Sequence, residues 1–126
     1  EVIYFLGQKA IDYGLVQEDF IESVLKRERI SSTCFFDTFA IPHGIDMSAR
    51  RTMVCILISS AGIPWDEHRI HIVLMITVHQ QDRKKFMELY NGIVRILENP
   101  EKVKHLIACN TYMEFIQCLL SLETDL

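Results

Sequence analysis

The stretch Asp-Thr-Phe-Ala-Ile-Pro-His-Gly at residues 37–44 contains the side chain best suited to chemistry, the imidazole of His43. Pro42 fixes its own φ and favours an extended residue before it, which predicts a short strand, Phe39-Ala40-Ile41, that ends at Pro42. Gly44 lets the backbone turn sharply or approach a ligand closely. We therefore expect His43 at a strand end, facing a cleft. With an unperturbed pKa of about 6.5, its ring is mostly unprotonated at neutral pH and can accept a phosphoryl group as a nucleophile.

Other reactive side chains form weaker patterns. An isolated Pro-His-Gly is more often a loop without chemistry, so the hypothesis for His43 depends on the rest of the chain. His68 and His71 lie beside two acidic residues, but no second pair of ligands completes a site, so we expect neither a metal nor a cofactor. The four cysteines form no C-x-x-C pair, which is typical of reduced core cysteines in a cytosolic protein: Cys34, Cys55, Cys109 and Cys118.

Length and charge restrict the classes of function. The chain has 126 residues, enough for one domain with a sizeable core. Its formal net charge is −4 and it contains no run of Lys or Arg, so we expect no direct nucleic-acid binding. The longest apolar run, residues 72–78, is far shorter than the about 20 residues of a membrane span. No signal sequence precedes the first predicted helix, so we expect a cytoplasmic protein without membrane insertion.

Two amphipathic helices are predicted in the N-terminal part. Apolar residues recur at helical spacing from Ile3 to Gly14, a predicted C-cap, and a second helix covers residues 17–29. Together they form an αα-hairpin. The segment Ser31-Ser32-Thr33 ends the second helix and begins the loop that leads to His43.

Two apolar segments predict strands. Residues 51–58 are mostly apolar and β-branched, which is typical of a buried central strand, and residues 70–78 form a second strand buried on both faces. Between them, residues 62–66 are predicted to form a turn. A sheet that is apolar on both faces needs helices on both sides.

The remaining helices are predicted after the strands. They cover residues 83–99, where Pro100 stops the helix, and residues 101–109. Thr111 and Glu114 form a capping box that opens the last helix, whose inner face is Phe115, Ile116, Leu119 and Leu120. The chain is thus expected to be one α/β domain over residues 1–126, with a mixed β-sheet flanked by helices on both faces in three layers.

Several separated features resemble one known family. In chain order they are Arg27-Glu28, Ser32-Thr33, Ala40-Ile41-Pro42-His43-Gly44, Gly62-Ile63-x-Trp65, and the tail pattern Val103-x-x-Leu106. These features resemble the enzyme IIA domains of the bacterial phosphoenolpyruvate-dependent sugar phosphotransferase system, of the mannitol/fructose type. The resemblance covers essentially the whole chain, and its most specific part is Ala-Ile-Pro-His-Gly.

The resemblance implies roles for two residues. His43 matches the histidine that receives phosphate from the histidine phosphocarrier protein and passes it to a IIB partner. Arg27 matches the active-site arginine of the family, whose guanidinium can bind the phosphoryl oxygens through two hydrogen bonds. Without the resemblance, Arg27 fits a solvated helix end equally well.

Two departures from the family pattern concern this site. Cys34-Phe35-Phe36-Asp37-Thr38 replaces the glycine-rich approach to the histidine found in transport-type members. The second active-site histidine of the family falls at Phe86, which cannot donate a hydrogen bond to a phosphoryl group. His79, at the end of the second strand, is the nearest candidate accessory residue, although a solvated histidine at a strand end is the commoner case.

These departures favour a regulatory protein. The chain looks most similar to the IIA-like C-terminal domains of transcriptional antiterminators and activators with phosphotransferase regulation domains, cut from a longer chain. Phosphorylation would then change the activity of the regulator, with the phosphocarrier protein, a IIB domain or other domains of the same regulator as partners. Two alternatives remain: a sugar-transport IIA component that turns over as a phosphotransferase, and a phosphorylation-deficient module for protein binding or dimerisation.

Overall fold

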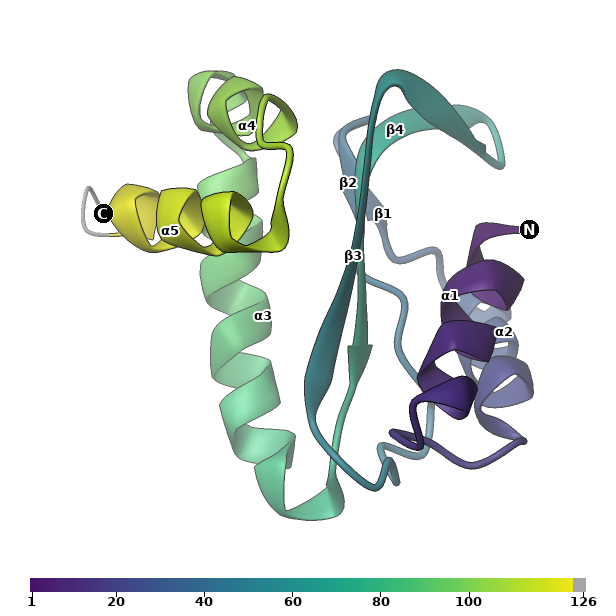
Figure 1. The fold of residues 1–126 in the computed structure, drawn as a ribbon. Helices are drawn as coiled ribbons and strands as arrows, with labels where there is room; N and C mark the ends of the chain where they lie inside the picture. The colour runs from purple at the N-terminus through teal and green to yellow at the C-terminus, as the bar shows by residue number, and fades with distance from the viewer. Residues whose placement is uncertain (124–126) are drawn as a thin grey trace.

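The computed structural model describes residues 1–123, with side chains to residue 121, as a three-layer α/β domain (Figure 1). Two helices come first, α1 (Val2–Asp12) and α2 (Phe20–Ile30). The strands are β1 (Cys34–Phe35), β2 (Phe39–Ala40), β3 (Met53–Trp65) and β4 (His68–Thr77). A 3-10 turn, η1 (Gln80–Asp82), leads to α3 (Arg83–Leu97), α4 (Pro100–Ile107) and α5 (Tyr112–Glu123). Within the described residues, no helix has the length and apolar content to cross a membrane.

The sheet is mixed, as the sequence predicts. Its strand order is β1-β2-β4-β3, with β2 parallel to β4 and the other neighbours antiparallel. Helices α1 and α2 cover one face, and α3, α4 and α5 cover the other (Figure 1). The predicted three-layer arrangement is therefore confirmed.

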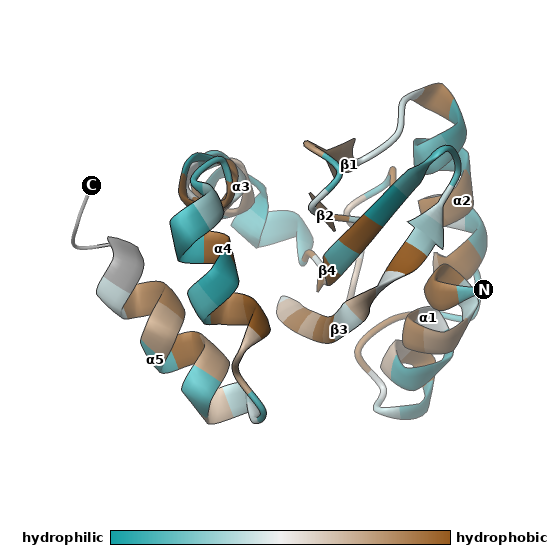
Figure 2. Cartoon of the chain, turned by 90° about the horizontal axis from the view of Figure 1, so that it is seen from above, coloured by the Kyte–Doolittle hydropathy of each residue, from teal (hydrophilic) through white to brown (hydrophobic). Residues whose placement is uncertain are grey.

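Each face of the sheet has its own hydrophobic core. Val73 and Met75 of β4 belong to the core beneath α1 and α2, whereas Leu74 and Ile76 belong to the core beneath α3, α4 and α5. Successive strand residues point to opposite faces, so one fully apolar strand can serve both cores. Figure 2 shows hydrophobic residues on β3 and β4 between the two helical layers.

The prediction of a buried central strand at residues 51–58 is wrong in one respect. Residues 53–58 belong to β3, which is an edge strand and only half-buried over much of its length. Its apolar character has another cause, because Cys55 and Leu57 pack against one core while Val54 and Ile56 pack against the other. Helices on both faces impose the same pattern on an edge strand as on a central one.

The predicted turn at residues 62–66 is also wrong. Here β3 continues through a register shift between Ile58 and Ile63, and it ends at Trp65, which pairs with His68. The chain reverses at Asp66, which has a positive φ of 55°. Gly62 has a φ of 96°, so this glycine allows an irregularity inside a strand.

The helices occur where the sequence predicts them, with ends that differ by up to three residues, as at α2, which begins at Phe20. The backbone N–H of Glu114 donates to Thr111 Oγ1 at 3.1 Å, in agreement with the predicted cap of α5. Leu120, predicted to face inward, is 56% exposed. It lies five positions after the buried Phe115, which places it about 140° away around the helix.

Candidate functional site

His43 lies just beyond β2, beside the central strand. It forms an isolated parallel bridge with Ile76 of β4, and the Pro42 carbonyl accepts a hydrogen bond from Ile76 N at 3.0 Å. The strand before it is β2, as expected from Pro42. His43 is only 5% exposed, so the imidazole is more enclosed than a side chain on the rim of an open cleft.

Gly44 brings this segment close to α2. A Cβ on Gly44 would lie 3.1 Å from Ser23 Oγ and 3.5 Å from a ring carbon of Phe20. The next residue, Ile45, donates its backbone N–H to the same Ser23 hydroxyl at 2.9 Å. The close approach that the sequence indicated is therefore an approach to α2.

The hydrogen bond of His43 determines which ring nitrogen carries the lone pair. Nδ1 lies 2.9 Å from the Ile41 carbonyl oxygen. A carbonyl only accepts, so Nδ1 carries the proton and Nε2 carries the lone pair. Nε2 has no hydrogen-bond partner within residues 1–123. Among these residues, every fully buried side-chain nitrogen or oxygen has a partner. Nε2 is therefore not fully buried, and solvent reaches it.

Burial keeps the ring neutral. The pKa of His43 is lowered from 6.5, chiefly because burial disfavours the imidazolium, while the hydrogen bond to Ile41 acts in the opposite direction. The positive charge of Arg27 lowers the pKa further. A neutral imidazole with a solvent-accessible Nε2 is a nucleophile that needs no prior deprotonation.

Two rings of α3 pack beside the imidazole. The Phe86 ring centroid lies 5.0 Å from that of His43, and the Tyr90 centroid lies 6.1 Å from it, with the Tyr90 ring edge-on at 79°. Phe86 is buried, and it occupies the place where the resemblance puts a second histidine. Tyr90 lies within the predicted helix 83–99 and had no predicted role in the site. Its spacing of four residues from Phe86, which places both on one helix face, is the signal that could have linked it to the site.

Arg27 lies in the last turn of α2, half-buried, and its charge reaches His43. Its Nη1 donates to the Ser31 carbonyl at 2.7 Å. The pKa values of both His43 and Tyr90 are affected by this guanidinium, which places it within electrostatic range of the imidazole and the phenol. Among the described residues no hydrogen bond joins Arg27 to His43, so these two predicted site residues are linked by charge and not by contact.

The neighbouring Glu28 ties α2 to the segment that carries His43. Its carboxylate accepts from the backbone N–H of Thr33 at 3.1 Å and also from the Thr33 hydroxyl. Thr33 is fully buried, and its carbonyl accepts from Ile41 N at 3.1 Å. Since the Ile41 carbonyl holds His43, a continuous set of hydrogen bonds runs from Glu28 to the imidazole.

His79 has other contacts. Its Nδ1 accepts from the backbone N–H of Gln81 at 3.1 Å and so caps η1, while its own backbone N–H donates to Thr52 Oγ1 at 2.8 Å. No hydrogen bond or ring contact joins His79 to His43 within residues 1–123. Its accessory role stays a prediction.

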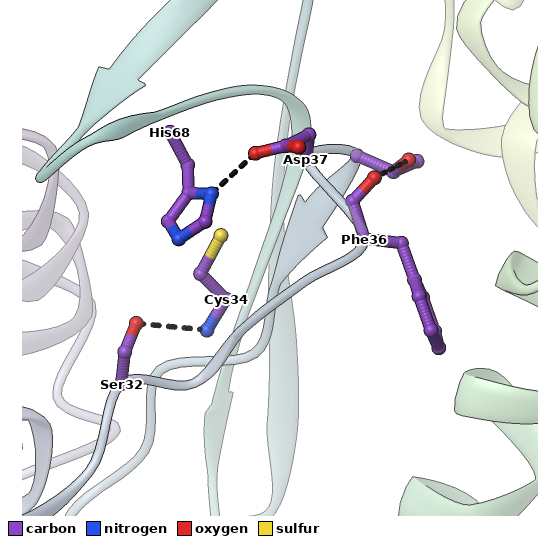
Figure 3. A network of polar contacts seen from close by, with 6 residues as sticks. Ser32, Cys34, Phe36, Asp37 and His68 are labelled. Atoms are coloured by element: carbon purple, nitrogen blue, oxygen red, sulfur yellow. Dashed lines mark hydrogen bonds and ion pairs between the residues drawn. The ribbon is translucent and has the colours of Figure 1, made fainter.

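The turn before β2 carries a second polar cluster (Figure 3). Asp37 pairs with His68, and the backbone N–H of Cys34 donates to Ser32 Oγ at 3.1 Å. Burial, reinforced by the charges of Asp37, Glu28 and Asp66, raises the pKa of Cys34 to about 11, so the thiol stays protonated. Among the described residues, no three His, Cys, Asp or Glu side chains come together as metal ligands.

Comparisons with known proteins find one matching family and several relatives. Residues 1–121 match the family described as "Phosphoenolpyruvate-dependent sugar phosphotransferase system, EIIA 2". The chain is 32% identical over 114 residues to the "Probable licABCH operon regulator" of Bacillus subtilis (strain 168), covering 90% of the chain and 18% of the regulator. The chain therefore spans less than a fifth of that relative.

A second relative, named as a phosphotransferase component, matches a similar share of the chain. The "Mannitol-specific phosphotransferase enzyme IIA component" of Bacillus subtilis (strain 168) is 26% identical over 119 residues, covering 92% of the chain and 82% of that protein. A solved complex of enzyme IIA mannitol and phosphorylated enzyme IIB mannitol from Escherichia coli has a chain of the same fold. Its TM-score is 0.77 at 17% identity, covering 95% of the present chain and 85% of the other.

Proposed function

Because the chain belongs to the type 2 EIIA family of the phosphoenolpyruvate-dependent sugar phosphotransferase system, we propose that it accepts a phosphoryl group on Nε2 of His43. The observation that supports this most is the state of the imidazole. It is neutral, its Nδ1 proton is held by the Ile41 carbonyl, and its Nε2 lone pair has no partner in the protein and is reached by solvent.

The proposed step is a transfer between two histidines. The Nε2 lone pair attacks the phosphorus of a phosphohistidine on the histidine phosphocarrier protein. The donor P–N bond breaks, its electron pair returns to the donor nitrogen, and the imidazole of the donor is released. As the new N–P bond forms, positive charge develops on the ring of His43, and the hydrogen bond from Nδ1–H to Ile41 stabilises it.

Arg27 supplies positive charge for the phosphoryl oxygens. A phosphohistidine carries up to two negative charges, which a planar guanidinium can bind through two hydrogen bonds. In the present structure the guanidinium donates a hydrogen bond to the exposed Ser31 carbonyl, and water can replace this contact. Reorientation toward Nε2 therefore costs little.

We infer a regulatory use of this phosphate. The 32% identity to an operon regulator and Phe86 in contact with the acceptor histidine both favour this use. Phosphorylation would then act on other domains of the same regulator. The second candidate, transfer to a IIB domain in sugar transport, is favoured by the mannitol IIA relative and by the shared fold with a IIA partner of phosphorylated IIB.

The test is the intact mass of the protein after incubation with phosphoenolpyruvate, enzyme I and the phosphocarrier protein. We expect an acid-labile gain of one phosphate that is lost in His43→Ala and kept in the control variant His105→Ala, since His105 is exposed on α4. No gain in the folded wild type, beside an active IIA control, would contradict the proposal and favour a binding module. Rapid transfer from the labelled protein to a IIB domain would favour transport over regulation.

A further inference from the structure

The site as proposed lacks a hydrogen-bond donor on one side. A phosphoryl group on Nε2 has three oxygens, and the nearest ring on α3, Phe86, is hydrocarbon and buried. A charged oxygen held against hydrocarbon loses hydration without compensation. Arg27 approaches from α2, the opposite helical layer, so a donor from α3 would complete the surroundings of the phosphoryl group.

Tyr90 has the geometry of that donor. It follows Phe86 by one helical turn on the same face of α3, and its ring packs edge-on to the imidazole. Three ring contacts hold it in place, at 6.1 Å to His43, 5.7 Å to Phe86 and 6.0 Å to Phe35. A side chain fixed on three sides loses little further entropy when it binds a ligand.

The Tyr90 hydroxyl is free to act. Within residues 1–123 the hydroxyl forms no hydrogen bond. Since no fully buried side-chain oxygen among these residues lacks a partner, the hydroxyl is in contact with solvent and is hydrated. Burial raises the pKa of Tyr90 above 10.0, and the opposing effect of Arg27 does not reverse this, so the phenol stays protonated at neutral pH. The group is thus an O–H donor whose partner in the absence of phosphate is water.

We propose that Tyr90 is a phosphoryl-binding residue, whose hydroxyl donates a hydrogen bond to an oxygen of the phosphoryl group on His43. This inference rests on the proposed phosphorylation of His43 and concerns how the phosphate is held. Tyr90 and Arg27 bind from opposite helical layers and take the place of the histidine that Phe86 replaces. No covalent bond of Tyr90 changes, and its proton stays on the phenol.

The test compares wild type with Tyr90→Phe, which keeps the ring and its packing and removes only the hydroxyl. The matched control is Tyr13→Phe, because Tyr13 is exposed and lies at the end of α1. Each protein is labelled by the phosphocarrier relay and, separately, by the small donor phosphoramidate. The half-life of the phosphohistidine and its 31P chemical shift are then measured at neutral pH.

We expect Tyr90→Phe to lose phosphate about tenfold faster than wild type. This factor is at the lower end of the rate change that corresponds to the loss of one hydrogen bond to a charged group. The 31P shift should change as well, whereas Tyr13→Phe should match wild type in both. Equal half-lives and equal shifts in Tyr90→Phe and wild type would overturn the role of Tyr90.

The two donors separate this inference from the function on which it rests. If phosphoramidate labels His43 and the relay does not, the proposed function fails while the half-lives still decide the role of Tyr90. Absence of labelling by both donors in a folded wild type would overturn both proposals.

Discussion

At the scale of single residues, the site combines a buried imidazole with an accessible lone pair. Burial disfavours protonation of His43, and the Ile41 carbonyl fixes the proton on Nδ1. The same burial means that a phosphoryl group on His43 would bring negative charge into a mostly apolar site, so neighbouring side chains must supply hydrogen bonds or positive charge to stabilise it.

The lowered pKa of His43 predicts a pH-dependent stability. Between the native pKa and 6.5, the unfolded chain binds a proton at this residue that the native chain does not, so the free energy of unfolding falls as pH drops below 6.5. In His43→Asn, whose amide can still donate to Ile41, this contribution is absent. Urea unfolding from about pH 7 to about pH 5 should therefore show a steeper loss in wild type.

The control for the pH series is His105→Asn, since His105 is exposed on α4. It should lose stability with falling pH as steeply as wild type. Identical slopes for wild type and His43→Asn would show that His43 titrates normally in the folded protein.

Arg27 is expected to matter for the phosphate and little for the fold. Arg27→Ala should label about tenfold more slowly or lose its phosphate about tenfold faster, because a charge-assisted hydrogen bond is removed. The unfolding midpoint should stay close to that of wild type, since the only described hydrogen bond of this side chain is the exposed one to Ser31. The measurement is the time course of acid-labile phosphate by intact mass.

Arg29→Ala is the matched control, because Arg29 is exposed in the same last turn of α2. It should label like wild type. If Arg27→Ala both gained and lost phosphate at the wild-type rates, Arg27 would be removed from the site.

At the scale of elements, the site is assembled where three separate segments meet. The end of α2 provides Arg27, the segment after β2 provides His43, and the first turns of α3 provide Phe86 and Tyr90. Glu28 joins the first two segments through the buried Thr33. The position of His43 relative to α2 thus depends on this carboxylate together with the hydrogen bond from Ile45 N to the Ser23 hydroxyl.

Glu28→Ala is expected to destabilise the domain by about 1–3 kcal/mol, the cost of leaving a buried polar group without its partner. The groups that lose their acceptor are the N–H and hydroxyl of Thr33, which is fully buried. Urea unfolding followed by far-UV circular dichroism measures the loss. Glu22→Ala, an exposed change on the same helix, should stay within about 0.5 kcal/mol of wild type. Equal stability of the two variants would argue against the Glu28 link.

At the scale of the whole molecule, two cores share one strand. Consecutive β4 residues contribute to opposite cores, so neither helical layer keeps its packing if β4 is lost. This arrangement favours unfolding as a single cooperative unit. The single tryptophan, Trp65, lies in the core beneath α1 and α2 and reports on that side alone.

Leu74→Ala tests this coupling from the opposite side. Leu74 is 1% exposed in the core beneath α3, α4 and α5, so its truncation should cost about 2–5 kcal/mol. We expect Trp65 fluorescence and far-UV circular dichroism to shift together to one lower urea midpoint. A Trp65 transition that stays at the wild-type midpoint would show that the two cores unfold independently.

The sequence by itself determined the features that are local in the chain. Helical spacing and caps located α1 to α5, apolar content located β4, and Pro42 and Gly44 placed His43 at a strand end. These features are readable because propensity, periodicity and turn chemistry act over a few neighbouring residues. The same local motif carried the resemblance to the family.

Only the tertiary structure decided how distant segments meet. The structure showed that β3 is an edge strand. The sequence could not predict this, because an apolar pattern on both faces of a strand depends on the helices that cover it and not on how many strands pair with it. The tertiary structure also brought Tyr90 to His43 and set the tautomer through Ile41, because such contacts join side chains that the sequence keeps far apart or leaves free to rotate. Burial and electrostatics at His43 depend on that assembly, so the state of the imidazole could not be predicted from its motif.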